Sequence, residues 1–153
     1  MKIATALLLL ASLALGCGQG TAPPSVSGAR LPVHPILVGN ERITAEIAAT
    51  EGDRAEGLMR RESMPESHGM LFIYPEVRIL TFWMRNTPLP LSIAFADDGG
   101  RIVQIADMEP FSESIVSSGA PARYALEMHQ GWFARHGVLP GDAIRGLPRL
   151  APE

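Results

Sequence analysis

The stretch LSIAFADDGGRIVQIADM, residues 91–108, holds two apolar runs with four turn residues between them. The turn at 97–100 reads Asp-Asp-Gly-Gly. Asp and Gly tolerate the positive φ angles of a tight turn, so an Asp-Gly pair between apolar runs is a strong signal for a β-hairpin. We therefore predict an antiparallel hairpin formed by residues 91–96 and 101–108.

Segments on both sides of this hairpin also have the patterns of short strands. Residues 42–48 alternate between apolar and polar side chains, which predicts a strand with one buried face. Further strands are expected at 69–74, where Pro75 ends the strand, and at 79–84, 122–128 and 142–145. The segment 109–121 is expected to be a loop, long enough to be functional or mobile.

A first short helix is expected after the strand at 42–48. Thr50 and Asp53 have the spacing of a capping box, with Asp in place of Glu, so a helix should begin here and continue to residue 61. Close packing against a sheet would explain a glycine, Gly57, inside this helix. Its apolar face would consist of Ala55, Leu58 and Met59.

A second helix of one or two turns is expected at 131–136, where Gly137 stops it. Short strands with frequent turns between them and only two short helices predict a mostly β domain. A compact β-sandwich or a partly closed barrel is the expected architecture.

The N-terminus has the features of a bacterial lipoprotein signal peptide. The apolar run at 3–15 is shorter than the roughly 20 residues that cross a membrane, and it suits the core of a signal peptide. Residues 13–17, Leu-Ala-Leu-Gly-Cys, resemble a lipobox, although Leu stands next to the Gly rather than one place earlier. We expect removal of residues 1–16 and lipidation of Cys17, the only cysteine in the chain. The alternative is an unused thiol in an ordinary signal peptide.

The remaining chain divides into three parts. Residues 17–35 are rich in Gly, Ser, Ala and Pro and are expected to be a lipidated, flexible tether. A single domain should occupy 36–146, and 147–153 should form a C-terminal tail. We expect an exported protein that is anchored to the cell envelope, on the periplasmic side or the cell surface, with the membrane as its partner through Cys17.

Composition argues against several classes of function. The formal net charge is −3 and the twelve arginines form no run, so the basic patch that nucleic-acid binding requires is missing. The sequence has no phosphate-binding glycine loop and no Gly-x-Ser-x-Gly motif. The four histidines, His34, His68, His129 and His136, lack the two-histidine spacing of a zinc-binding helix. A metal shared by His129 and His136 is the weaker alternative, and we expect neither a metal nor a cofactor.

Three blocks of the sequence resemble, in the same order, those of the DUF192 family, also called UPF0127. They read GLMRRESMPESHGMLFIY (57–74), FWMRNTPLPLSIAF (82–95) and YALEMHQGWFARHGVLPGD (124–142). The resemblance extends from about residue 40 to 146 and implies a compact sandwich-like or barrel-like β fold with small helices. It implies no known activity, because the family is named for lacking one.

One position departs from the family pattern. Where members of the family usually have Pro-Leu-Asp-Ile, this chain has Pro-Leu-Ser-Ile, with Ser92 in place of the acid. A serine does not act as an anion, so an acid–base mechanism that depends on this position is in doubt here.

The strand at 79–84 and the turn after it contain a first group of candidate binding residues. Alternation places Phe82 and Met84 on a core face and Trp83 and Arg85 on the other. Trp83 and Arg85 could stack on a planar or sugar ligand and hold a carboxylate or phosphate. The alternative is Trp83 packed under the first helix and Arg85 paired with a nearby acid. Asn86 and Thr87 could contact a ligand or simply form the turn.

A second group is expected on the strand at 122–128. Arg123 and Glu127 share the face opposite Tyr124, Leu126 and Met128, and Arg54 of the first helix is a third candidate. These residues could line one polar pocket, or Glu127 could form a structural ion pair with Arg85 or Arg54.

Three functions remain open at this stage. The first is a lipid-anchored envelope module that binds a ligand or a partner without catalysis. The second is an enzyme acting on a small anionic or saccharide envelope component, with Arg85, Arg123 and Glu127 in its site and Trp83 as the platform. The third is a structural surface protein whose aromatic residues belong to the core.

Overall fold

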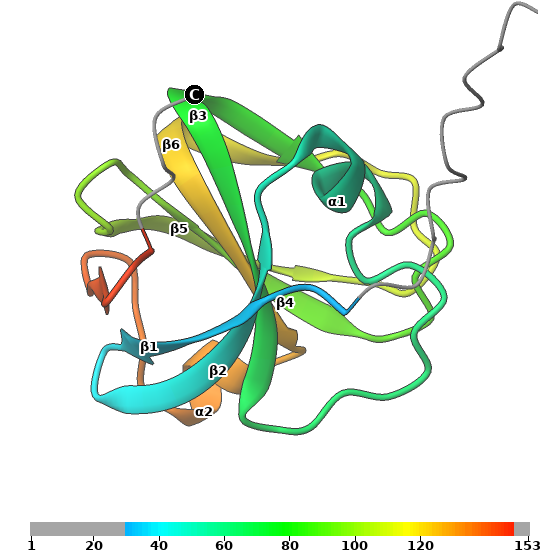
Figure 1. Cartoon of the computed structure of the whole chain (residues 1–153), viewed down its shortest axis with the longest axis horizontal. Coiled ribbons are helices and arrows are strands. Elements are labelled where there is room, and N and C mark those ends of the chain that lie inside the picture. The colour runs from blue at the N-terminus through cyan, green and yellow to red at the C-terminus, as the bar shows by residue number, and fades with distance from the viewer. Residues whose placement is uncertain (1–29, 149–153) are drawn as a thin grey trace, which may run out of the picture.

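The computed structural model describes residues 30–148, which form one curled seven-stranded sheet with two short helices (Figure 1). The order of the strands across the sheet is β5-β4-β6-β3-β2-β1-β7. Strands β2 and β3 are parallel, and all other neighbours are antiparallel. The elements are β1 (Val33–Val38), β2 (Glu41–Ala48), α1 (Glu51–Glu56), β3 (His68–Phe82), β4 (Leu91–Ala96), β5 (Ile102–Met108), β6 (Val116–His129), α2 (Trp132–Arg135) and β7 (Ile144–Arg145).

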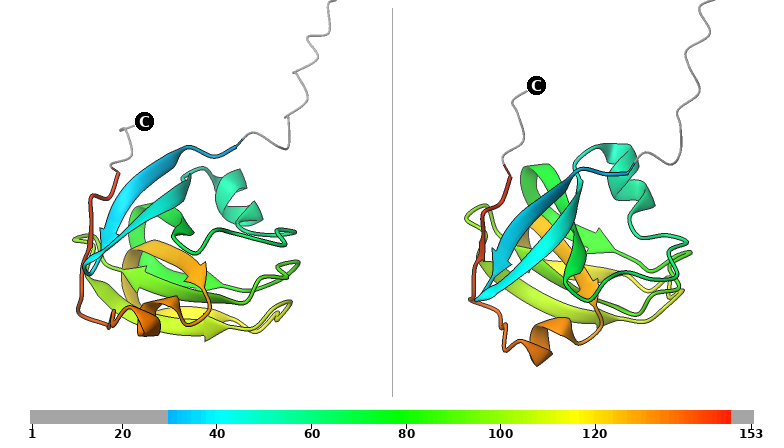
Figure 2. Two further views of the ribbon diagram at one scale, coloured as in Figure 1. Left: turned by 90° about the horizontal axis from the view of Figure 1, so that it is seen from below. Right: turned by 60° about the horizontal axis from the view of Figure 1, so that its bottom comes forward.

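The two ends of the sheet curl toward each other and make a partly closed barrel (Figure 2). The backbone N–H of Ile102, in β5, donates to the carbonyl of Asp142, and the N–H of Ile144, in β7, donates to the carbonyl of Gly100, each at 2.8 Å. Gly100 has a φ of +80°, and a Cβ there would lie only 2.5 Å from the oxygen of Ile144. The mostly β architecture predicted from the sequence is confirmed.

Apolar side chains form a core on each face of the central strands β3, β4 and β6. One core fills the barrel and includes Leu71, Leu126 and Trp132. The other lies on the opposite face, includes Met70, Phe72 and Phe95, and contacts Leu58 in the segment after α1. All six residues of β4 are buried, since the strand contributes to both cores.

The predicted hairpin and capping box are both present. Strands β4 and β5 pair antiparallel around the turn at 97–100. The hydroxyl of Thr50 accepts from the N–H of Asp53 at 3.1 Å, and the Asp53 carboxylate accepts from the N–H of Thr50 at 3.3 Å.

The first helix is shorter than predicted. It ends at Glu56 rather than continuing to residue 61, because Gly57 has a φ of +52° and caps it. Leu58 is therefore buried from the turn after α1 and does not belong to a helical face. The close packing expected at Gly57 does exist, since a Cβ there would lie 3.3 Å from the ring of Phe72.

Three strands differ from the prediction. Residues 69–74 and 79–84 belong mostly to one continuous strand, β3, and Pro75 does not end it. The pairing of β3 with β6 shifts register between Ile73 and Arg78, so Pro75 lies where no ladder pair needs its missing N–H. Strand β6 begins at Val116, inside the predicted loop 109–121. Strand β1 begins at Val33, so 33–35 join the sheet rather than the tether.

The predicted signal peptide, Cys17, most of the tether and the last residues of the tail lie outside the described residues. Within residues 30–148, no helix has the length and apolar character needed to span a membrane.

Gly69 should be one of the least replaceable residues of the sheet. A Cβ at this position would lie 2.5 Å from the backbone oxygen of Glu127 and 2.4 Å from the sulfur of Met128. We expect Gly69→Ala to lower the free energy of unfolding by about 1–3 kcal/mol in urea titrations, because overpacking displaces backbone. Gly52→Ala is the control, since helical Gly52 has no atom nearer than 3.9 Å. The control should gain up to about 1 kcal/mol, and equal effects of the two changes would contradict the prediction.

Candidate functional site

Two arginines lie against the ring of Tyr74 in β3. The guanidinium carbon of Arg54 is 4.9 Å from the ring centroid and that of Arg78 is 4.8 Å, within the range of a cation–π interaction. Arg54 comes from α1, whereas Arg78 follows the register shift in β3. Burial raises the pKa of Tyr74 above its ordinary value, although the two arginines oppose this effect. Its phenol is therefore neutral at pH 7.

A third arginine reaches the same segment of β3 from β6. The Arg123 Nε donates to the carbonyl of Tyr74 at 3.2 Å, and the Arg54 Nη1 donates to the carbonyls of Ala49 and Ile73, the latter at 2.9 Å. Arg123 also forms a salt bridge with Asp98 at 2.6 Å. Arg54 and Arg123 therefore contact consecutive carbonyls of β3.

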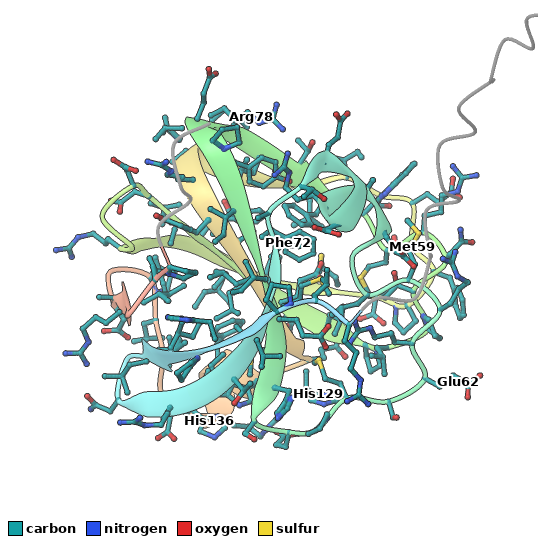
Figure 3. The ribbon with its side chains drawn as sticks, in the orientation of Figure 1. Met59, Glu62, Phe72, Arg78, His129 and His136 are labelled. Carbon is teal, nitrogen blue, oxygen red and sulfur yellow. The ribbon has the colours of Figure 1, made fainter. Side chains whose placement is uncertain are left out.

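A pocket of about 380 Å³ lies between α1 and the bend of β3, and Figure 3 shows Arg78 there, near α1. Neither Arg54 nor Arg78 has a carboxylate of the described residues within 4.0 Å, although two acids line the pocket. Two guanidinium groups beside one ring, neither in a salt bridge with a described residue, favour binding of an anion in this pocket. The pocket, called the Tyr74 pocket below, is lined by Glu51, Arg54, Ala55, Tyr74, Pro75, Glu76 and Arg78.

Trp83 and Arg85 lie outside the Tyr74 pocket, on the surface after β3. Trp83 is 41% exposed, so it does not pack under the first helix as one alternative supposed. The Arg85 guanidinium lies 5.4 Å from the Trp83 ring and 3.9 Å from the Glu113 carboxylate. Phe82 and Met84 are buried, as alternation predicted.

Asn86 and Thr87 make turn interactions. Asn86 has a φ of +55°, and its carbonyl accepts from the N–H of Arg60 at 2.8 Å. Thr87 is buried, and its hydroxyl donates to the carbonyl of Arg85 at 3.2 Å. These contacts explain why a short amide side chain and a hydroxyl occur in this turn, and a ligand contact stays a prediction.

Glu127 is a buried acid in apolar surroundings. It lies in register with Met70 of β3 and Ile93 of β4, and it is only 4% exposed. Its carboxyl has no hydrogen bond or ion pair with any residue in 30–148, and burial raises its pKa to about 8. The proposed ion pair of Glu127 with Arg85 or Arg54 is therefore absent within the described part of the chain.

The candidate residues do not converge on one site. Arg123 and Glu127 share a face of β6, as predicted, but lie four residues apart, which corresponds to about 13 Å along a strand. Arg85 pairs with Glu113 rather than with Glu127. The sequence pointed to Arg54 but missed Tyr74 and Arg78, because only the register shift in β3 brings Arg78 back to the Tyr74 ring.

Ser92 has a structural role in this chain. Its hydroxyl donates to the carboxylate of Asp107 on β5 and accepts from the N–H of Gly131 at 2.8 Å. Gly131 immediately precedes α2. The side chain at position 92 therefore holds the start of α2 against the sheet.

Three of the described histidines, His34, His129 and His136, contact backbone carbonyls rather than one another. The Nε2 of His129 lies 2.7 Å from the carbonyl of Met64, and the Nδ1 of His136 lies 2.8 Å from that of Trp132. Figure 3 places both at the side of the domain opposite Arg78. Within 30–148, no group of three or more His, Cys, Asp or Glu side chains could hold a metal ion.

The fold and the Tyr74 pocket define a partly closed β-barrel domain with an arginine-lined pocket beside one short helix. The model of the DUF192 family, described as "Uncharacterized ACR, COG1430", matches residues 35–146. The chain therefore belongs to the DUF192 family. No curated protein matches the chain.

Solved structures that are similar to this chain include the following two. One, from Sinorhizobium meliloti 1021, carries a provisional name as a transcription regulator; it is 37% identical, with a TM-score of 0.69, over 72% of this chain and 89% of its own. The other, from Novosphingobium aromaticivorans DSM 12444, is described as a protein of unknown function. It is 33% identical, with a TM-score of 0.72, over 88% of this chain and 99% of its own.

The buried carboxyl of Glu127 should make stability depend on pH. Unfolded Glu127 ionises near pH 4.5, whereas the folded state keeps the proton up to about pH 8. Stability should therefore fall as pH rises through this window, by up to about 1.4 kcal/mol per pH unit from this group. Glu127→Gln, which mimics the neutral acid, removes this dependence.

Urea titrations at pH 5.5 and 7.5 measure the effect. The free energy of unfolding of Glu127→Gln minus that of the wild type should be about 2 kcal/mol larger at pH 7.5 than at pH 5.5. The same difference at both pH values would contradict a buried, protonated Glu127.

Proposed function

We propose that this protein is a lipid-anchored DUF192 protein of the cell envelope that binds a small anionic ligand in the Tyr74 pocket without transforming it. The observation that carries the proposal is the pair of arginines, Arg54 and Arg78, which flank one aromatic ring and have no carboxylate partner among the described residues. A phosphate or carboxylate group would neutralise them and accept their N–H donors.

Arg54 and Arg78 would have different roles in binding the ligand. Arg54 is held by two backbone carbonyls, so its guanidinium is fixed before a ligand arrives. Arg78 is exposed and makes no salt bridge within the described part of the chain, so it is available to close on the ligand. Tyr74 would contribute an aromatic wall, which suits an anion attached to a sugar or another ring.

Export and anchoring rest on the N-terminal sequence. The apolar run at 3–15 and the Leu-Ala-Leu-Gly-Cys segment at 13–17 support lipidation of Cys17, and the tether would then hold the domain near the membrane.

Catalysis is the second candidate, and Glu127 is the observation that favours it. An acid whose pKa is about 8 carries a proton at neutral pH, as a general acid must. The arginines that would bind a substrate contact other groups, Arg85 with Glu113 and Arg123 with Asp98. Binding in the Tyr74 pocket does not require Arg85 or Arg123 to leave these partners. We therefore prefer ligand binding to catalysis as the function.

Ligand binding is tested with inorganic phosphate and glucose 6-phosphate, with glucose as the neutral control. Both anions should raise the melting temperature saturably, and glucose should not. Arg78→Ala should weaken binding roughly tenfold, because it removes one charge-assisted contact. Arg42→Ala, at an exposed arginine outside the pocket, should bind as the wild type does. Absence of stabilisation by either anion, or equal binding by the two variants, would contradict the proposal.

Lipidation is tested in bacteria grown with radiolabelled palmitate. The full chain should incorporate the label and sediment with membranes, whereas Cys17→Ser should incorporate no label and should leave a soluble or uncleaved form, because Cys17 is the only thiol available for attachment. Label that persists in the serine variant would overturn the anchor.

A further inference from the structure

Three large apolar side chains are exposed together on two neighbouring loops. They are Trp83, at 41% exposed, and Phe111 and Ile115, at 63% and 64%. We call these three residues the loop patch. Trp83 follows β3 and the other two precede β6, so the patch lies where these paired strands begin and end.

Backbone contacts hold the two loops together. Phe82 pairs with Val116, so the next residues outward along the two chains are Trp83 and Ile115. The N–H of Met84 donates to the carbonyl of Ser112 at 2.7 Å, and the N–H of Phe111 donates to the carbonyl of Thr87 at 3.0 Å. The loop patch therefore belongs to a fixed surface.

The loop patch exposes aromatic side chains, and one of them has an unfavourable backbone conformation. Phe111 has a φ of +59°, a left-handed conformation that is unfavourable for an aromatic residue, and yet its ring is not buried. Alternation buries Phe82 and Met84 and turns Trp83 outward. Neither the core nor the pocket explains these exposed rings.

We propose that the loop patch inserts into the interface of the lipid bilayer to which Cys17 anchors the protein. This inference rests on the proposed lipidation. A Trp, a Phe and an Ile are residue types that bind at the boundary of headgroups and acyl chains. Arg85, beside the Trp83 ring, is paired with Glu113, so the apolar side chains carry the contact.

The chain length between the anchor and the domain supports a bilayer as the occupant. Twelve residues lie between Cys17 and Arg30, where the described chain begins, and the thirteen Cα-to-Cα steps span at most about 45 Å. The anchor would thus keep the patch within reach of one membrane, so weak apolar insertion becomes an intramolecular event. Both views of Figure 2 show the chain entering β1 on the side of the domain where the β3–β4 and β5–β6 loops lie.

The two tryptophans provide the test. Trp83 is exposed, whereas Trp132 is 2% exposed in the barrel core. The full-length lipidated protein is reconstituted into phosphatidylcholine vesicles that contain brominated acyl chains. Bromine should quench at least a third of the fluorescence and shift the remaining emission, whereas Trp83→Phe, which retains only Trp132, should show neither effect. Flotation of the vesicles confirms that each variant is anchored.

A second pair of variants separates insertion from simple proximity. Phe111→Ser combined with Ile115→Ser should at least halve the quenching of Trp83 without changing flotation. Leu139→Ser is the matched control, because Leu139 is equally exposed but lies between α2 and β7. Protein that floats without quenching overturns the bilayer contact and leaves the anchor intact. Protein that does not float overturns the anchor and, with it, the bilayer contact.

Discussion

The pairing of β3 with β6 is the interaction on which the rest of the structure depends. These two long strands make a ladder from Met70–Glu127 to Phe82–Val116, and each core uses one face of it. Strand β2 joins β3 in parallel, while β4 joins β6, so the barrel and the second core extend from the same pair. The tight contact of Gly69 with the backbone of Glu127 shows how closely these strands approach.

Local patterns were sufficient to predict the hairpin, the strand at 42–48 and the capping box of α1. Each depends on residues near one another in the chain, such as Asp-Gly at a turn or Thr50 with Asp53. The length of β3 could not be predicted, because a proline usually ends a strand, and only pairing with distant β6 shows that Pro75 occupies a register shift. The start of β6 was missed because 109–121 contains residues typical of a loop.

The same difference between local and non-local information applies to the candidate site. The sequence identified Arg54 and Glu127 as unusual polar residues, but it gave no way to place them. Arg54 meets Tyr74 and Arg78 through non-local packing of α1 on β3, while Glu127 lies among Met70 and Ile93 without a partner in 30–148. A charged residue in an alternating strand is expected to face solvent, so the burial of Glu127 depends on the second core, which alternation alone does not reveal.

Ser92 shows how far a family motif can be translated into chemistry. Its hydroxyl accepts from Gly131 at the start of α2 and donates to Asp107 across the β4–β5 ladder. A carboxylate at position 92 would accept the same N–H, and here the carboxylate stands one strand away instead. A serine supplies the acceptor for the N–H of Gly131 and also donates to Asp107, which an ionised acid at position 92 could not do. In this chain the motif that contains Ser92 therefore joins the start of α2 to the sheet, and the acid beside it is Asp107 on β5 rather than residue 92.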